Sequence, residues 1–163
     1  MTNKIGIYPG TFDPMTNGHI NIVKRSLNLV DKLIIAIADN PSKKTLLNTN
    51  ERKQIIENDI LTYELNCNKI QIEIVKGLLT DFAKSFNVNF IIRGLRAVSD
   101  FEYEFQMTGM NYQLNSNIET IFLMSSDNNS FISSNLVKQV HQLGGDVSNF
   151  VSKNTIDILN NKN

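Results

Sequence analysis

The sequence predicts an α/β fold: a single Rossmann-like domain with a doubly wound, parallel, five-stranded sheet and helices on both faces. Short apolar runs alternate with helical patterns along the chain, an order typical of a parallel sheet covered by helices. The run Leu33–Ala38 is apolar throughout, as expected of a strand buried on both faces. The length of 163 residues favours one domain, 1–163, whose last polar residues (160–163) should fray.

Each apolar run is interpreted as one strand. The run Ile70–Val75 alternates apolar and polar residues, which indicates a half-exposed strand or one near the sheet edge. The expected strands are Ile5–Tyr8, Leu33–Ala38, Ile70–Val75, Phe90–Ile92 and Thr120–Met124.

Helical patterns fill the intervals between these runs. Thr49 and Thr80 stand where a side chain would cap the second and third helices. Gly144 and Gly145 are a typical stop for the fifth helix. The expected helices cover Ile20–Val30, Glu51–Leu65, Thr80–Phe86, Asp100–Leu114, Ser134–Leu143 and Thr155–Leu159.

The composition restricts the classes of function. Sixteen basic residues balance sixteen acidic ones, so we expect neither a nucleic acid nor a membrane as partner. The single cysteine, Cys67, excludes an intrachain disulfide and a cysteine-rich metal site, and we expect no role for it. The N-terminus has no signal-peptide pattern, and no apolar run approaches the ~18 residues of a spanning helix. These features predict a soluble, cytoplasmic protein.

A polar segment follows each expected strand. In open parallel sheets ligands bind beyond the carboxyl ends of the strands, so these segments should meet at one edge. They are rich in Gly, Ser, Thr, Lys and Arg, which suit a phosphate-bearing ligand. The segments are Gly10–His19, Asn40–Lys44, Gly77–Thr80, Arg93–Arg96 and Ser125–Asn135.

The first of these segments ends in Thr16-Asn17-Gly18-His19, between a strand and a helix, the arrangement that holds nucleotide phosphates. Gly18 lets the backbone approach a ligand closely. A protonated or donor imidazole of His19 would bond a phosphate oxygen, and Thr11 would share that phosphate. A turn with an exposed histidine is the alternative for the short motif alone.

Cationic and hydroxyl side chains mark the later segments. Lys43 would supply a point charge for phosphate, and Arg93 and Arg96 a bidentate grip. The alternatives are a solvated lysine loop and surface arginines paired with neighbouring carboxylates. Ser133 and Ser134, at a helix start, either cap that helix or bind an anion. We interpret His141, in mid-helix, as structural.

Four stretches match a family: YPGTFDPMTNGH, PSKK, IIRGLRAVSDFEYE and SFISSNLVK. Through them, and over the chain to about Val151, the sequence resembles the bacterial phosphopantetheine adenylyltransferases, within the superfamily marked by T/H-x-G-H and I-S-S-x-x-x-K. The stretch IRGLRAVSDFEYE is the more specific and indicates the acceptor. The resemblance implies transfer of AMP from ATP to 4′-phosphopantetheine, giving dephospho-coenzyme A and pyrophosphate by direct in-line attack with no covalent intermediate. It also implies Mg²⁺ and a homohexamer.

The resemblance implies roles for individual residues but assigns no metal ligands. His19 would stabilise the transition state, with Lys43 and Arg93 as the other catalytic residues. The acceptor would contact Thr11, Lys43, Leu79 and Arg93. ATP would contact Thr11, Phe12, His19, Gly94, Leu95, Arg96, Glu104, Asn129, Ser130, Phe131, Ile132, Ser133, Ser134 and Asn135. The sequence departs from the family at Asn129, often aromatic, and at Asn135, often serine.

Two other functions remain open. The first is a T/H-x-G-H transferase that acts on a nicotinamide or glycerol phosphate, which Arg93 and the IRGLR run disfavour. The second is a nucleotide-binding module without catalysis, which the presence of both His19 and Lys43 disfavours.

Overall fold

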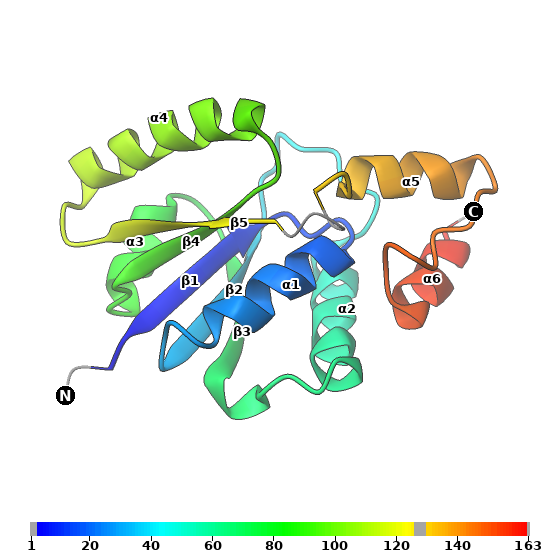
Figure 1. Ribbon diagram of the computed structural model, residues 1–163, viewed down its shortest axis with the longest axis horizontal. Coiled ribbons are helices and arrows are strands. Elements are labelled where there is room, and N and C mark those ends of the chain that lie inside the picture. Colours follow the sequence, from blue (N-terminus) through cyan, green and yellow to red (C-terminus); the bar gives the residue numbers. More distant parts are fainter. Residues whose placement is uncertain (1–2, 126–129, 163) are drawn as a thin grey trace.

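The computed structural model describes residues 3–125 and 130–162. Within them, five parallel strands form one sheet in the order β3-β2-β1-β4-β5 (Figure 1). The predicted α/β class and parallel sheet are therefore confirmed. The strands are β1 (Ile5–Gly10), β2 (Lys32–Ala38), β3 (Ile70–Val75), β4 (Phe90–Leu95) and β5 (Glu119–Met124).

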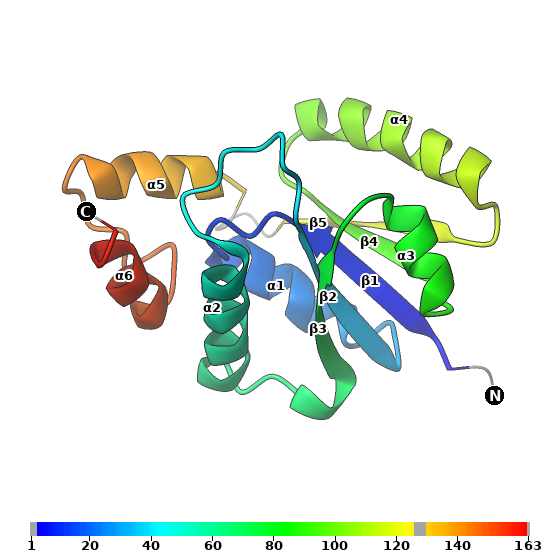
Figure 2. The same cartoon turned by 180° about the vertical axis from the view of Figure 1, so that it is seen from behind.

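Helices cover both faces of the sheet. Helices α1 and α2 pack on one face and α3 and α4 on the other, while α5 and α6 lie beyond the carboxyl ends of the strands (Figures 1 and 2). One short 3₁₀ helix, Cys67–Lys69, precedes β3. The helices are α1 (Asn17–Ser26), α2 (Thr49–Thr62), α3 (Leu79–Ser85), α4 (Val98–Leu114), α5 (Ser134–Gln142) and α6 (Lys153–Asn160).

The sheet separates two hydrophobic cores. Alternate residues of a strand point to opposite faces, so Tyr8 joins the larger core under α1 and α2, and Ile7 joins the smaller core under α3. Strand β2 lies inside the sheet with its five middle residues buried, and β3 is an edge strand, as their sequences predict.

Four local predictions are wrong, the first being the end of α1, which lies at Ser26 rather than at Val30. The N-cap of α2 is Asn48, because its side chain accepts a hydrogen bond from the amide of Glu51, whose carboxylate bonds the Asn48 amide in return. Thr80 does not cap α3, since the helix begins at Leu79 and Thr80 is already buried in its first turn. Strand β4 continues through Arg93 to Leu95, because these residues pair with β5.

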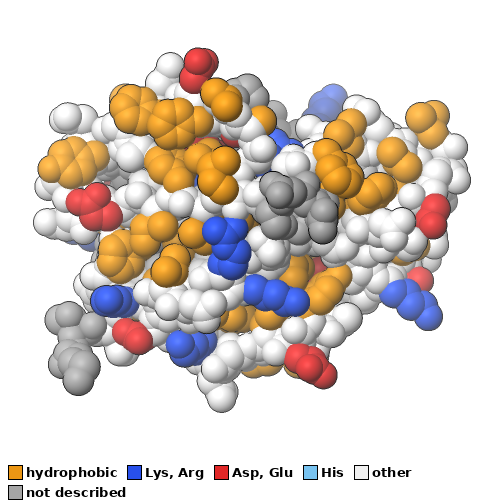
Figure 3. All heavy atoms as spheres, viewed as in Figure 1, with side chains coloured by type: hydrophobic (Ala, Val, Ile, Leu, Met, Phe, Trp, Pro, Cys, Tyr) orange, Lys and Arg blue, Asp and Glu red, His pale blue; other side chains and the backbone are white. Residues whose placement is uncertain are grey.

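Helix α4 leaves many large apolar side chains exposed. Phe101 and Phe105 are 44% and 62% exposed, so neither lies in a core of this chain. Figure 3 shows hydrophobic side chains gathered over α4 and β5. Among the residues that the structure describes, no helix has the length and apolarity needed to cross a membrane.

Candidate active site

Two adjoining cavities open at the carboxyl ends of the strands, where the polar segments were expected to meet. The first, of about 540 Å³, lies among the loop after β1, the end of β4 and the start of α5. The second, of about 510 Å³, lies among the ends of β2 and β3 and helices α3 and α4. The two share part of their lining, so ligands bound in them would meet there. The shared residues are Pro9, Gly10, Thr11, Lys43, Arg93 and Glu104.

His19 is the third residue of α1 and faces the first cavity. Its Nδ1 accepts a hydrogen bond from the Thr16 amide at 3.0 Å, while the Thr16 side chain accepts one from the His19 amide. This reciprocal cap holds the ring in one orientation. The ring also packs edge-on against Phe12, with centroids 5.2 Å apart.

The imidazole of His19 is neutral and carries its proton on Nε2. Burial, followed by the positive charges of Arg96 and Arg93, lowers its pKa to about 4. Since a backbone amide can only donate, Nδ1 is an acceptor and the ring proton sits on Nε2. Of the two possibilities drawn from the sequence, a protonated or a donor imidazole, the geometry supports the neutral donor.

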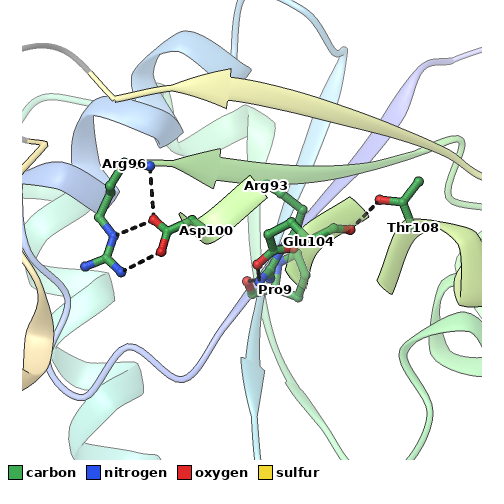
Figure 4. Close-up of polar contacts among 6 residues, drawn as sticks. All are labelled: Pro9, Arg93, Arg96, Asp100, Glu104 and Thr108. Carbon is green, nitrogen blue, oxygen red and sulfur yellow. Dashed lines mark hydrogen bonds and ion pairs between the residues drawn. The ribbon is translucent and has the colours of Figure 1, made fainter. Parts of the chain in front are cut away.

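Arg93 lies where the two cavities meet, anchored by Glu104 of α4 (Figure 4). Its Nε donates to Glu104 at 2.7 Å, a second nitrogen pairs with the other carboxylate oxygen, and the third donates to the Pro9 carbonyl at 2.8 Å. These contacts use three of the five N–H donors of a guanidinium. The arginine is therefore held rigidly and still offers donors to a ligand.

Arg96 forms a second, separate pair with Asp100, at 3.2 Å (Figure 4). It lines the first cavity only. The carboxylate pairing that the sequence left open as an alternative thus occurs for Arg93 and Arg96, and both pairs lie within the cavity lining.

Lys43 and Leu79 also take the expected places. Lys43 lies on an exposed loop, lines both cavities, and forms no ion pair within the described part of the chain. Leu79, at the start of α3, lines the second cavity. Thr11 lines both cavities.

The start of α5 closes the first cavity. Ser133 is the N-cap and accepts a hydrogen bond from the Leu136 amide at 3.2 Å, and the Ser134 hydroxyl donates to the Pro14 carbonyl at 2.7 Å. Ile132 and Asn135 complete this wall. Both serines therefore have structural partners, and the α5 N-terminus faces a place where an anion is stabilised.

Some of the expected ATP residues lie differently. Phe12 and Gly94 line the first cavity, but the Phe12 ring is buried, so any contact to ATP would come from its backbone. The remaining expected residues line neither cavity or cannot be placed: Leu95 is buried, Phe131 is exposed and packs on Phe150, Ser130 is outside both linings, and Asn129 lies outside the described residues.

Sequence reasoning missed three charged residues at this edge: Asp13 and Arg52, which are buried, and Lys138, which is partly buried. Asp13 and Lys138 form an ion pair of 2.6 Å, and Arg52 donates to the Thr11 and Ala38 carbonyls, each at 2.9 Å. Asp13 lies in the stretch GTFDP and Lys138 in the motif I-S-S-x-x-x-K, so these two residues could have been identified from the matched motifs. Arg52 carries none, because a helical arginine is usually solvated.

The carboxylates of the first cavity already have cationic partners. Asp13 pairs with Lys138, Asp100 with Arg96 and Glu104 with Arg93. Among the described residues no three His, Cys, Asp or Glu side chains cluster as metal ligands. The described side chains therefore do not build a metal site of their own.

Comparison with known families matches residues 7–140 to the cytidylyltransferase-like family. Solved structures share the fold. A bifunctional NMN adenylyltransferase/ADP ribose pyrophosphatase from Francisella tularensis, complexed with AMP and a manganese ion, superposes with a TM-score of 0.72 at 19% identity, over 98% of this chain and 49% of that one. A Plasmodium falciparum nicotinic acid mononucleotide adenylyltransferase gives 0.72 at 16% identity, over 98% and 96%. The fold and site thus define a nucleotidyltransferase of the cytidylyltransferase-like family.

Full-length relatives narrow this class. A phosphopantetheine adenylyltransferase of Wolbachia pipientis from Culex pipiens (strain wPip) is 52% identical over 163 residues, covering 100% of this chain and 95% of the relative. Another from Pelagibacter ubique is 50% identical over 161 residues, covering 98% of each. The chain belongs to the phosphopantetheine adenylyltransferase family.

Proposed function

We propose that this protein transfers AMP from ATP to 4′-phosphopantetheine, giving dephospho-coenzyme A and pyrophosphate in coenzyme A biosynthesis. One observation carries the proposal: two cavities of similar size meet at a shared lining that contains Thr11, Lys43 and Arg93. ATP fits the first cavity, which has the helix N-termini. The acceptor fits the second, where Leu79 would contact the pantetheine arm and the phosphate would reach the shared lining.

The proposed reaction is a single in-line displacement. A phosphate oxygen of the acceptor attacks the α-phosphorus of ATP and forms the new P–O bond. The bond from that phosphorus to the oxygen bridging to the β-phosphate breaks, and pyrophosphate leaves with the electron pair. The acceptor phosphate is already anionic, so no base is needed and no covalent enzyme intermediate forms.

The residues would lower the barrier by position and charge. Two polyanions repel each other, and Lys43 and Arg93 at the shared lining offset that repulsion. The Nε2–H of His19 would donate to the α-phosphate as its charge develops. Ionised side chains favour anions in the first cavity, where the cations outnumber the carboxylates: Lys43, Lys44, Arg93, Arg96 and Lys138 against Asp13, Asp100 and Glu104.

Mg²⁺ enters the proposal as a companion of ATP. It is bound in many enzymes through one or two carboxylates together with substrate phosphates and water. Because the described carboxylates of the first cavity are paired, the triphosphate itself would supply most of its ligands. When bound, the ion would neutralise part of the phosphate charge.

A homohexamer and a cytoplasmic location complete the proposal. The exposed apolar side chains of α4 support association, because single chains rarely leave so many large hydrophobic side chains in water. Analytical ultracentrifugation would measure the assembly. The exposed residues of α4 include Val98, Phe101, Tyr103, Phe105, Met107, Met110, Tyr112 and Leu114.

Pyrophosphate release from ATP tests the activity. We expect release that depends on 4′-phosphopantetheine, and no comparable release with nicotinamide mononucleotide or glycerol phosphate. Release with either of these instead would identify a different transferase, and ATP binding without release would indicate a non-catalytic module.

Two arginine variants test the assignment of the cavities. Arg93 lines both cavities, whereas Arg96 lines only the first. Arg93→Ala should raise the KM for phosphopantetheine more than the KM for ATP, and Arg96→Ala should do the opposite. Equal effects of Arg93→Ala on the two substrates would contradict its role at the acceptor phosphate.

A further inference from the structure

Asp13 connects three segments at the rim of the first cavity. Its Oδ1 accepts a hydrogen bond from the Leu47 amide at 2.9 Å, and its Oδ2 accepts one from the Leu46 amide at 3.0 Å. Oδ2 also accepts from the Nζ of Lys138, on α5, at 2.6 Å. The loop after β1, the loop before α2 and helix α5 therefore meet on one carboxylate.

Each of these segments carries part of the site. The loop after β1 leads to His19, the loop before α2 carries Lys43 three residues ahead of Leu46, and α5 begins with Ser133 and Ser134. The hydroxyl of Ser134 donates to the carbonyl of Pro14, a second tie between α5 and the first loop. A shift of Asp13 would thus move the two substrate sites relative to each other.

The carboxylate of Asp13 is built into the protein rather than presented to a ligand. Its side chain is only 5% exposed, against 18% for Lys138. Both of its oxygens are occupied by the three donors just named. A buried carboxylate is stable only with such partners, since an uncompensated buried charge is costly.

We propose that Asp13 is a positioning residue for the transfer reaction, whose carboxylate holds the Lys43 loop and the start of α5 in register with His19. This inference rests on the proposed function. It assigns Lys138 an indirect part: its ammonium acts through Asp13 and anchors α5. The ion pair spans 125 residues of sequence and joins two motifs that the substrate contacts alone do not connect.

The structure offers a matched control for this pair. Glu51 and Lys162 form an ion pair of the same 2.6 Å between α2 and the C-terminal end, and neither residue lines a cavity. Asp13→Asn is compared with Glu51→Gln, and Lys138→Met with Lys162→Met. The wild type, these four variants and the double variant Asp13→Asn/Lys138→Met make six proteins. For each we would measure kcat, the KM for each substrate and the melting temperature.

Asp13→Asn replaces one acceptor oxygen by a donor NH₂ group, which then faces an amide or an ammonium. We expect kcat/KM to fall about 10–100-fold for both substrates, as when other orienting partners are removed. Lys138→Met leaves the two amide bonds intact, so it should raise the KM for ATP and leave that for the acceptor within about twofold. The double variant should be no slower than Asp13→Asn.

Several outcomes would overturn the proposal. If Asp13→Asn lowers stability like Glu51→Gln and leaves both KM values and kcat unchanged, the pair is only structural. If Asp13→Asn lowers the KM for ATP while Lys138→Met abolishes turnover, Lys138 binds phosphate directly and Asp13 merely restrains it. If Asp13→Asn does not fold, equal kinetics of Lys138→Met and Lys162→Met refute the proposal. Absence of product with the wild type would instead contradict the proposed function.

Discussion

His19→Asn separates two functions of one ring. In the structure Nδ1 caps α1 by accepting from the Thr16 amide at 3.0 Å, and the proton lies on Nε2, toward the first cavity. An asparagine Oδ1 lies at about the same distance from the backbone as Nδ1 and can accept the same bond. The substitution keeps the cap and removes the donor, whereas His19→Ala removes both.

The two effects have different sizes. Removing one preorganised donor to developing negative charge costs about 10²–10³ in kcat, equivalent to about 2.7–4 kcal/mol. Removing the cap bond costs about 1 kcal/mol of unfolding free energy, or about 2–4 °C in melting temperature at this chain length. Both variants should therefore lose the same factor in kcat, but only His19→Ala should melt earlier.

The assay combines pyrophosphate release at saturating substrates with calorimetric ATP binding and thermal melting. ATP affinity should change little, because the donor acts mainly on charge that develops in the transition state. A kcat of His19→Asn within about threefold of the wild type would refute the donor role, since the expected loss is at least tenfold greater. A kcat loss that appears only in His19→Ala would place the effect in the cap.

Two further predictions concern stability. Burial lowers the pKa of His19 from 6.5 to about 4, so the stability of the protein should rise with pH between these two values. Burial raises the pKa of Asp59 from 3.8 to about 6, so the contribution of Asp59 to stability should fall with pH between these two values. The two opposite slopes flatten the pH dependence of the wild-type free energy of unfolding. In Asp59→Asn the free energy of unfolding, measured with urea, should rise with pH by up to about 1.4 kcal/mol per pH unit. A pH dependence parallel to that of the wild type would contradict this. Asn48→Ala should cost about 1 kcal/mol of stability by removing the N-cap of α2, measured by calorimetry against the exposed control Asn68→Ala, which lies in the 3₁₀ helix.

The strands were predictable because burial alone selects their residues. Leu33–Ala38 has to be apolar in the middle of the sheet, and the alternation in Ile70–Val75 follows from its place at the edge. Their ends were not predictable in the same way. Arg93 is charged and was assigned to a loop, but its backbone completes a ladder with β5 and its side chain finds Glu104.

The predicted start of α2 was wrong because two possible capping residues are adjacent in the sequence. Both Asn48 and Thr49 are good N-caps, and the choice depends on which one lies three residues before a side chain that can return the bond. Glu51 makes Asn48 that residue. At Leu78 no side chain caps α3, so no local capping signal marks the start of that helix.

The buried ring of Phe12 packs beneath the first cavity and supports the loop after β1 and the ring of His19. Its backbone has a positive φ of 50°, a conformation unusual for a bulky residue, and its ring fills the space where a Cβ on Gly10 would stand, at 2.7 Å. The same ring packs against His19. Sequence reasoning placed Phe12 among the ATP contacts, and the packing assigns its side chain a supporting place instead.

Three cations of the first cavity are held in place by carboxylates, a pairing that a linear sequence motif does not show. Arg93, Arg96 and Lys138 line the first cavity, and each is paired with a carboxylate that fixes its position before any ligand arrives. A guanidinium that spends three donors on Glu104 and Pro9 still has two for phosphate, so pairing costs Arg93 little of its binding capacity. Preorganised charge of this kind stabilises a transition state without reorganisation. Lys43, on an exposed loop, forms no ion pair with the described residues, and neither does Lys44 beside it. We therefore expect Lys43 to adjust to the acceptor, so the anchors of its loop at Leu46 and Leu47 should matter for the reaction.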